Sequence, residues 1–208
     1  MKKILLATVS ILSLARTAMA DGADVAGPFN PGDIMLRARA IDVRPDVSSS
    51  LSIGGTVSVN NNTVPEIDAS YFFTPQVSAE LIAAVTRHNV TTNTGVNAGS
   101  AWLLPPTLTL QYHFTQYPDV AIPYVGAGIN YTHFFDATGG ALNAAHYDDS
   151  VGPALQAGID VPIKGNWYAN LDVKKLYIST TAKFSPSGVR ADVDINPWVI
   201  GAGVGYKF

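Results

Sequence analysis

Six residues between positions 133 and 150 carry side chains that could support metal binding or nucleophilic catalysis. They are His133, Asp136, His146, Asp148, Asp149 and Ser150. Histidines and carboxylates can hold a metal ion, and a serine beside a histidine and an aspartate can act as a nucleophile. No ligand or nucleophile motif accompanies these residues, and exposed loops often contain them. We therefore expect a solvated loop with no metal, no cofactor and no catalysis, and we keep a membrane enzyme acting on lipid as a third alternative.

A second set of ionisable residues recurs at alternate positions and has nearly balanced signs. The set comprises Arg37, Arg39, Glu66, Asp68, Glu80, Asp160, Asp172 and Lys174. These charges alternate with apolar neighbours, so in extended strands they face the side opposite to the apolar residues. Buried charges must be paired. We expect a salt-bridged plug inside the fold, and a proton or ion path through these residues is the alternative.

The pattern that positions these charges is an alternation of apolar and polar residues, which occurs eight times. The segments are 33–43, 64–74, 77–88, 104–114, 124–131, 151–163, 167–174 and 198–208. Short connections at 74–76, 115–121 and 164–166 alternate with long ones at 44–63, 89–101, 135–150 and 179–192. Short periplasmic turns and long external loops are typical of outer-membrane barrels. The sequence predicts an all-β, eight-stranded antiparallel transmembrane barrel, closed by pairing of the last strand with the first because open edges are costly in lipid.

Aromatic residues decide which face of the barrel meets the lipid. They cluster on the apolar face at the ends of the strands, as two girdles do in membrane barrels. The girdle residues are Tyr71, Phe73, Tyr112, Phe114, Trp167, Trp198, Tyr206 and Phe208. A soluble barrel would point its apolar face inward and would not need aromatics at strand ends. We therefore expect the apolar face to lie outside.

Residues 1–20 have the pattern of a secretory signal peptide. Two lysines precede an apolar run at 4–14, and Ala18-Met19-Ala20 supplies the small residues that signal peptidase accepts. Cleavage after this motif leaves residues 21–208 as the barrel. It removes three of the 13 basic residues and none of the 16 acidic ones, so the exported chain has a formal charge of −6. A mildly acidic chain without a basic cluster has no electrostatic footprint for nucleic acid, and the lack of cysteine excludes disulfides and thiolate metal sites.

Three motifs resemble those of the OmpW family of small outer-membrane proteins. They are Leu104-Pro105-Pro106-Thr107-Leu108, the stretch from Pro123 to Tyr131, and the ending from Pro197-Trp198 to Phe208. Asn196 stands where this family more often has Asp, which weakens any role for that carboxylate. The resemblance implies a barrel in the bacterial outer membrane, among phospholipid and lipopolysaccharide, that passes small hydrophobic molecules. It also implies that the barrel-assembly machinery reads the terminal Phe208.

An eight-stranded barrel has an interior just wide enough for side chains, so any passage is narrow. Inward glycines could thin the packing and leave a pocket, or they could serve where strands bend. These glycines are Gly126, Gly128, Gly152, Gly158, Gly201 and Gly203. We expect the pocket or its gate to be formed by Trp102, Leu103, Pro105, Pro197 and Val199.

Prolines in the upper parts of four strands each remove a donor from the backbone ladder. They are Pro65, Pro105, Pro106, Pro153 and Pro197. One interpretation is that the strands part there and release an apolar solute sideways into the bilayer. The alternative is that the strands project beyond the membrane, where water satisfies the carbonyls. The sequence thus favours passive transport of small hydrophobic molecules, and a structural or receptor barrel with a plugged lumen and partner-binding loops is the second candidate.

Overall fold

The computed structural model describes residues 29–138, 140, 144–185 and 188–208. The predicted signal peptide, residues 1–20, lies outside the described residues. Within them, no helix is both long and apolar enough to cross a membrane.

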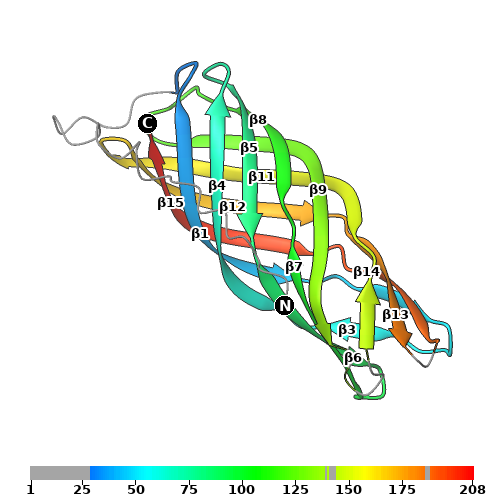
Figure 1. The fold of residues 1–208 in the computed structure, drawn as a ribbon. Coiled ribbons are helices and arrows are strands. Elements are labelled where there is room, and N and C mark those ends of the chain that lie inside the picture. Colours follow the sequence, from blue (N-terminus) through cyan, green and yellow to red (C-terminus); the bar gives the residue numbers. More distant parts are fainter. Residues whose placement is uncertain (1–28, 139, 141–143, 186–187) are drawn as a thin grey trace, which may run out of the picture.

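Eight strands form a closed antiparallel barrel, as predicted (Figure 1). In order around the wall they are β1 (Ile34–Arg44), β4 (Asn62–Phe72), β5 (Val77–Ala84), β8 (Thr107–His113), β9 (Ile122–Thr138), β11 (Ser150–Lys164), β12 (Trp167–Leu176) and β15 (Trp198–Lys207). β15 returns to β1, with Leu36 opposite Tyr206 and Arg44 opposite Trp198. This pairing leaves no open edge between the last strand and the first, which is what hydrocarbon surroundings require.

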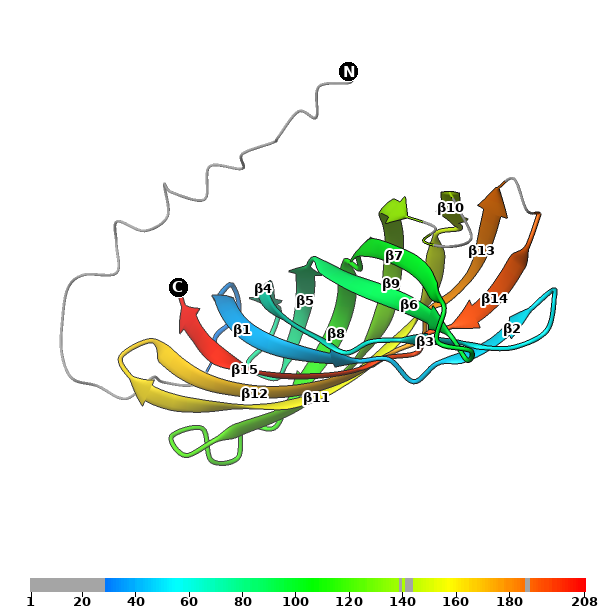
Figure 2. The same ribbon diagram turned by 90° about the horizontal axis from the view of Figure 1, so that it is seen from below.

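Seven further strands lie in segments that were mostly predicted as loops, and there the prediction is wrong. They are β2 (Ser48–Leu51), β3 (Val57–Val59), β6 (Thr86–Thr92), β7 (Asn97–Leu104), β10 (Ala144–Tyr147), β13 (Ser179–Ser185) and β14 (Arg190–Asp194). β10, β13, β14 and β2 form one sheet, and β3, β6, β7 and β9 are paired in that order. Figure 2 shows these strands gathered at one end of the barrel, where they extend the wall. They are strands because alternate residues such as Val57, Val90 and Val193 stay buried beyond the barrel proper.

The apolar face of the barrel is on the outside. Ile67, Leu110 and Leu171 are each 60% exposed, whereas Arg37 on the opposite face is 2% exposed and Glu80 is fully buried. This is the reverse of a water-soluble barrel and matches a surface that meets lipid.

The predicted girdle aromatics occupy both ends of this outer face. At the end with short turns, edge-on ring pairs join Tyr71 to Phe73, Tyr112 to Phe114, Trp167 to Tyr206, and Tyr206 to Phe208, with centroids 4.8–5.3 Å apart. Trp198 begins β15 at the other end and is 47% exposed.

The interior is layered along the barrel. An apolar cluster of Phe29, Met35, Phe72, Ile122 and Tyr168 fills the short-turn end, where Phe29 stacks on Phe72 with ring centroids 4.0 Å apart. A larger apolar cluster fills the extended end. The ionisable residues lie between the two clusters. The sequence analysis did not predict the inward-facing apolar cluster at the short-turn end.

Candidate functional site

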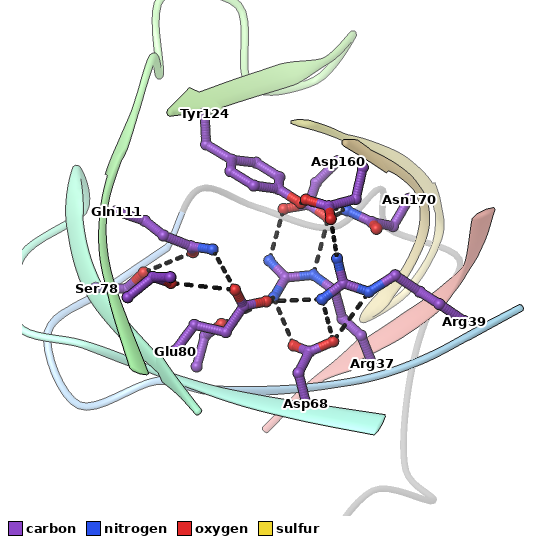
Figure 3. Close-up of polar contacts among 12 residues, drawn as sticks. Arg37, Arg39, Asp68, Ser78, Glu80, Gln111, Tyr124, Asp160 and Asn170 are labelled. Atoms are coloured by element: carbon purple, nitrogen blue, oxygen red, sulfur yellow. Dashed lines mark hydrogen bonds and ion pairs between the residues drawn. The ribbon is translucent and has the colours of Figure 1, made fainter. Parts of the chain in front are cut away.

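The centre of the barrel is a network of ion pairs around two arginines of β1 (Figure 3). Arg37 Nη2 lies 2.8 Å from Asp160 Oδ2, and its Nη1 lies 3.0 Å from Asp68 Oδ1. The side chains of these three residues are fully buried. Adjacent inward positions of β1 therefore project two guanidinium groups into the middle of the lumen.

Arg39 contacts more carboxylates than any other cation of this network. Its guanidinium nitrogens lie 3.2 Å from Glu66, 2.7 Å from Glu80 and 3.2 Å from Asp172, and it also pairs with Asp68. Lys174 Nζ then joins Glu66 at 2.7 Å and Asp172 at 2.8 Å. The structure thus brings all eight residues of the predicted plug into one connected network.

Neutral side chains complete the network, and the sequence analysis did not single them out. Five carboxylates face three cations, so carboxylate oxygens remain that need other donors. Gln111 donates to Glu80 at 2.7 Å, Gln156 donates to Glu80 and Asp172, and the Tyr124 hydroxyl donates to Asp172 at 2.8 Å. These residues alternate with apolar ones on the same strands as the charges, which is the only sequence signal that could have identified them.

An inner cavity of about 40 Å³ lies directly above this plug. Its lining includes four of the five predicted pocket residues, Leu103, Pro105, Pro197 and Val199. The ion-paired Glu66 and Lys174 also line it, and most of the other lining residues are apolar. The cavity is therefore an apolar chamber that borders the top of the plug.

An outer cavity of about 30 Å³ follows among the extended strands. Both cavities are lined by His88, Leu103 and Ile195, which makes these residues the boundary between two chambers. Since one water needs roughly 10–15 Å³ by this kind of measure, the outer chamber has room for about two or three waters and the inner one for about three or four. A solute as large as a benzene ring passes only if wall side chains move.

Trp102, the fifth residue expected at the pocket, lines neither cavity. The indole stacks with Phe135 at 6.4 Å and lies under the guanidinium of Arg87 at 5.8 Å. The reason is the strand period: Leu103 faces the lumen, so its neighbour Trp102 faces outward.

Four of the six inward glycines sit where strands approach closely, and none of the six lines either cavity. A Cβ on Gly128 would lie 1.9 Å from the Leu108 carbonyl oxygen, and one on Gly203 would lie 2.0 Å from the Ala38 carbonyl oxygen. Such distances are impossible for a side chain. Gly152 and Gly158 are restricted in the same way, with backbone oxygens 1.9 and 2.7 Å from a Cβ, so the stereochemical alternative holds for these four glycines. At Gly126 and Gly201 the nearest atoms belong to side chains, at 3.2 and 3.0 Å.

The wall beside the inner cavity contains a break in the backbone ladder, which we call the wall slot. Pairing of β5 with β8 ends at Ile82 opposite Thr107 and resumes in the same register at Thr86 of β6 opposite Leu103 of β7. The slot is the unpaired interval, residues 83–85 facing 104–106. Two of its six residues are Pro105 and Pro106, which have no N–H to donate.

Both rims of the wall slot remain attached to the rest of the wall. Ala84 pairs with Glu66 of β4 on one side, and Tyr131 of β9 donates its N–H to the Pro106 carbonyl at 3.0 Å on the other. Ala84 and Pro105 also line the inner cavity. The slot is thus the place where the inner cavity meets an unbonded part of the wall.

The other prolines do not open a comparable slot. The carbonyls of Pro153 and Pro197 accept backbone hydrogen bonds from Tyr177 and Leu176 at 3.1 and 3.2 Å. Pro65 pairs with Ala40 of β1. On the other side of β4, the Asn62 side chain donates to the Arg87 carbonyl at 2.8 Å and so connects β4 to β6. Among the described prolines of the barrel wall, only the pair Pro105 and Pro106, between β7 and β8, lies at an unpaired part of the wall that adjoins a cavity.

The six residues with catalytic or metal-binding side chains do not assemble into a shared site. His133 Nδ1 lies 2.9 Å from Asp149, whereas His146 is 3.7 Å from Asp148. Ser150 accepts a hydrogen bond from the Ser179 N–H at 3.0 Å, and Asp136 lies within β9, with φ of 47°, where the pairing with β7 shifts register. No group of three histidine, cysteine or acidic side chains able to hold a metal occurs in the described chain.

Asp149 nonetheless has a defined local environment outside the membrane. The Tyr131 hydroxyl donates to it at 2.5 Å and His133 contacts it as well. Hydrogen bonds, first from Tyr131 and then from His133, lower the pKa of Asp149 to about 2. The carboxylate therefore stays ionised and ties β9 to the start of β11.

Asn196 performs its structural role through oxygen atoms that aspartate would also provide. It has φ of 36°, a left-handed conformation that asparagine tolerates. Its Oδ1 accepts a hydrogen bond from the Ile178 N–H at 3.0 Å, and its carbonyl accepts one from Lys175 Nζ at 2.6 Å. The missing carboxylate charge therefore does not remove this link between strands.

Comparison with known proteins agrees with this architecture. A sequence model of the OmpW family matches residues 30–208. Uncharacterized outer-membrane protein y4mB of Sinorhizobium fredii is 42% identical over 88% of this chain and 82% of its own length. The crystal structure of the outer membrane protein OprG from Pseudomonas aeruginosa superposes with a TM-score of 0.79 at 30% identity, covering 87% of this chain and 98% of OprG. A more distant relative, dibenzothiophene metabolism operon protein PahQ of Pseudomonas aeruginosa, is 27% identical over 74% of this chain and 76% of its own length. The chain therefore belongs to the OmpW family and is an integral β-barrel of the bacterial outer membrane.

Proposed function

We propose that this barrel is a passive conduit that carries small apolar solutes from the outside through the two cavities and releases them sideways through the wall slot. The observation that carries the proposal is the position of the inner cavity, which lies above a fully buried ionic plug and beside an unbonded stretch of wall. The chemistry is permeation without bond making, so no catalytic residue is needed.

Energetics favour the sideways route over a route straight down the lumen. Separating one partner of a buried ion pair costs about 3–5 kcal/mol, and the plug contains several such pairs. A backbone group left unpaired in hydrocarbon costs several kcal/mol, but the slot has no ladder bonds to break. An apolar solute therefore meets a lower barrier at the slot than at the plug.

The lining of the chambers supports an apolar cargo. The outer cavity is lined largely by valine, alanine, isoleucine and phenylalanine side chains. Moving an apolar solute from water onto such an apolar surface is favourable. The relative named for a dibenzothiophene metabolism operon supports the same class of solute.

The proposal is tested with vesicles whose outer leaflet is lipopolysaccharide, because that leaflet is the barrier that an apolar solute must avoid. The measured quantity is the rate at which an environment-sensitive apolar fluorophore reaches the bilayer core. We expect vesicles with the protein to be faster than empty vesicles, with no increase for a hydrophilic dye of similar size.

A matched control is a variant in which the inner cavity is filled. Ala84→Phe adds a ring at the cavity wall. Permeation at the rate of empty vesicles by the wild-type protein would overturn the proposal. Equal rates for the wild type and the filled variant would show that the solute does not use this cavity.

A further inference from the structure

The strands that extend the barrel belong to two sheets. β10, β13, β14 and β2 form a four-stranded sheet, whereas β3, β6, β7 and the upper end of β9 continue the sheet of the barrel. Within the described chain, no ladder pair joins a strand of the four-stranded sheet to a strand of the other sheet. Below this division the wall is bonded, with Thr132 of β9 opposite Ser150 of β11 and Val43 of β1 opposite Asn62 of β4. The rim above the barrel is therefore split into two sheets that no backbone ladder holds together.

The outer cavity lies between the two sheets. β3, β6, β7 and β9 line it on one side, and β10, β13 and β14 line it on the other. Its volume of about 30 Å³ has room for a few waters but not for an apolar solute. A solute can occupy it only if the walls move apart, and the division between the sheets is where that motion breaks no ladder bond.

The sheets meet along two seams that are held in different ways. At the seam between β2 and β3, the Ser49 hydroxyl accepts a hydrogen bond from the Val57 N–H at 2.9 Å and donates to the Val57 carbonyl at 3.3 Å. At the seam between β9 and β10, no backbone hydrogen bond links the described residues 133–138 to 144–147. This second seam is crossed by a ring stack of Phe134 on Tyr147, with centroids 5.6 Å apart and planes 17° from parallel. The β9–β10 seam is therefore the more weakly bonded of the two.

The path of β9 explains why its upper end does not pair with β10. Between its pairs with Trp102 and Ser100 of β7, β9 carries one residue more than β7 does. Asp136 within this interval has φ of 47°. A bulge of this kind bends the strand that carries it, and here β9 follows β7 instead of β10.

Opening the β9–β10 seam separates few strong contacts. Asp149 fixes the base of the seam, where its carboxylate accepts a hydrogen bond from the Phe134 N–H at 3.3 Å. Above that point no backbone hydrogen bond has to break. An aromatic pair such as Phe134 and Tyr147 changes an equilibrium by about two- to tenfold. An apolar solute can offset a change of that size when its own contacts replace those of the rings.

We propose that the β9–β10 seam is the entrance through which solutes reach the outer cavity, and that the stacked rings of Phe134 and Tyr147 hold it closed. In the open state the four-stranded sheet and β9 lie further apart, and the cavity between them is larger. The inference rests on the proposed function, because it names the entrance of the conduit. It makes no use of the wall slot.

The test measures the distance between the two sheets by pulsed electron paramagnetic resonance in nanodiscs. The chain has no cysteine, so nitroxides attach only where cysteines are introduced. One pair, Thr91→Cys with Asp192→Cys, labels exposed positions of β6 and β14 on different sheets. The control pair, His146→Cys with Asp192→Cys, labels exposed positions of β10 and β14 within the four-stranded sheet. Each pair is measured in the otherwise wild-type chain, in Tyr147→Ala and in Tyr147→Phe, with and without toluene.

We expect the pair across the sheets to show a closed and a more distant population, and the pair within one sheet to show a single distance. Tyr147→Ala removes the ring and should raise the ratio of open to closed molecules by about two- to tenfold or more. Tyr147→Phe keeps the ring and loses a hydroxyl that has no hydrogen-bond partner among the described residues, so its ratio should equal that of the wild type. Toluene should raise the open fraction of the wild type, because a ligand favours the state that can hold it.

A cross-sheet distance that toluene leaves unchanged in the wild type would overturn the entrance, while permeation in the vesicle assay would still support the conduit. This result needs no substitution, so it holds even if Tyr147→Ala folds poorly. An open fraction in Tyr147→Ala no higher than in Tyr147→Phe would overturn the role of the rings. A matching change in the within-sheet pair would show that the sheet unfolds instead of moving, and would also overturn the inference. Conversely, opening by toluene together with permeation no faster than in empty vesicles would refute the conduit and retain the opening of the seam.

Discussion

Replacing Arg39 with methionine removes the most connected cation of the plug while keeping a side chain of similar length. In the wild-type barrel this guanidinium contacts Glu66, Asp68, Glu80 and Asp172. The wild-type plug has five carboxylates and three cations, and the variant has the same five carboxylates with only two cations. Arg37 still pairs with Asp68 and Glu80, and Lys174 still pairs with Glu66 and Asp172, so each of these carboxylates keeps one cation but shares it with another carboxylate.

The expected loss of unfolding free energy is about 3–5 kcal/mol, the usual cost of removing one partner from a buried ion pair. The side chains of Arg39, Asp68 and Glu80 are fully buried, so solvent does not screen the change. Protonation of a carboxylate can relieve part of the cost, which places the expected loss toward the lower end of this range at neutral pH.

The assay is urea unfolding in lipid vesicles, followed by tryptophan fluorescence, with Arg44→Met as the control on the same strand. Arg44 pairs with Asp42 at the surface, where its side chain is 57% exposed, so its loss should cost less than about 1 kcal/mol. Arg39→Lys keeps the charge but loses the planar fork and should fall between the two. A loss in Arg39→Met as small as that in Arg44→Met would refute the account of the plug.

Three other substitutions test separate parts of the structure. Replacing both Pro105 and Pro106 with alanine restores two N–H groups, of which the one at position 105 can face β5, since the carbonyl of residue 106 is bonded to β9. The ladder should then extend and apolar permeation should fall several-fold in the vesicle assay; an unchanged rate would contradict the slot. Gly203→Ala places a Cβ 2.0 Å from a backbone oxygen and should destabilise the barrel by about 2 kcal/mol or more in urea unfolding, whereas a neutral effect would contradict the close approach of the strands. Tyr131→Phe removes the largest cause of the low pKa of Asp149, so that pKa should rise from about 2 toward its usual value. Because the pKa is depressed in the folded state, the stabilisation is present above pH ~4 and is lost as the pH falls toward about 2, and this acid dependence should weaken in the variant. Carboxyl NMR titration measures the pKa, and an unchanged value would argue against that hydrogen bond.

The barrel and its plug could be predicted because both follow from a period of two. When one face of a strand meets lipid, charges at every second position must face the lumen. The alternation alone therefore places Arg37 and Glu80 in the lumen. The outward position of Tyr71 and Phe73 follows in the same way. The family resemblance added the expected hydrophobic cargo.

Other features depend on distances between segments, which alternation does not encode. The loop at 179–192 contains β13 and β14 because they pair with each other and with β10 and β2, and no short-range signal marks such pairing. Trp102 and Leu103 were both expected at the pocket, although the strand period places the two on opposite faces.

The wall slot is the central claim, and a reversible cross-link tests it most directly. The chain has no cysteine, so a pair can be introduced without background. Val85→Cys with Leu104→Cys spans the slot from the outer face, and Leu81→Cys with Leu108→Cys joins residues that are already paired beside it. Apolar permeation is measured in lipopolysaccharide vesicles for each oxidised and reduced barrel. The account predicts that oxidation stops permeation in the slot pair alone and that reduction restores it, whereas undiminished permeation through the oxidised slot pair would contradict lateral release.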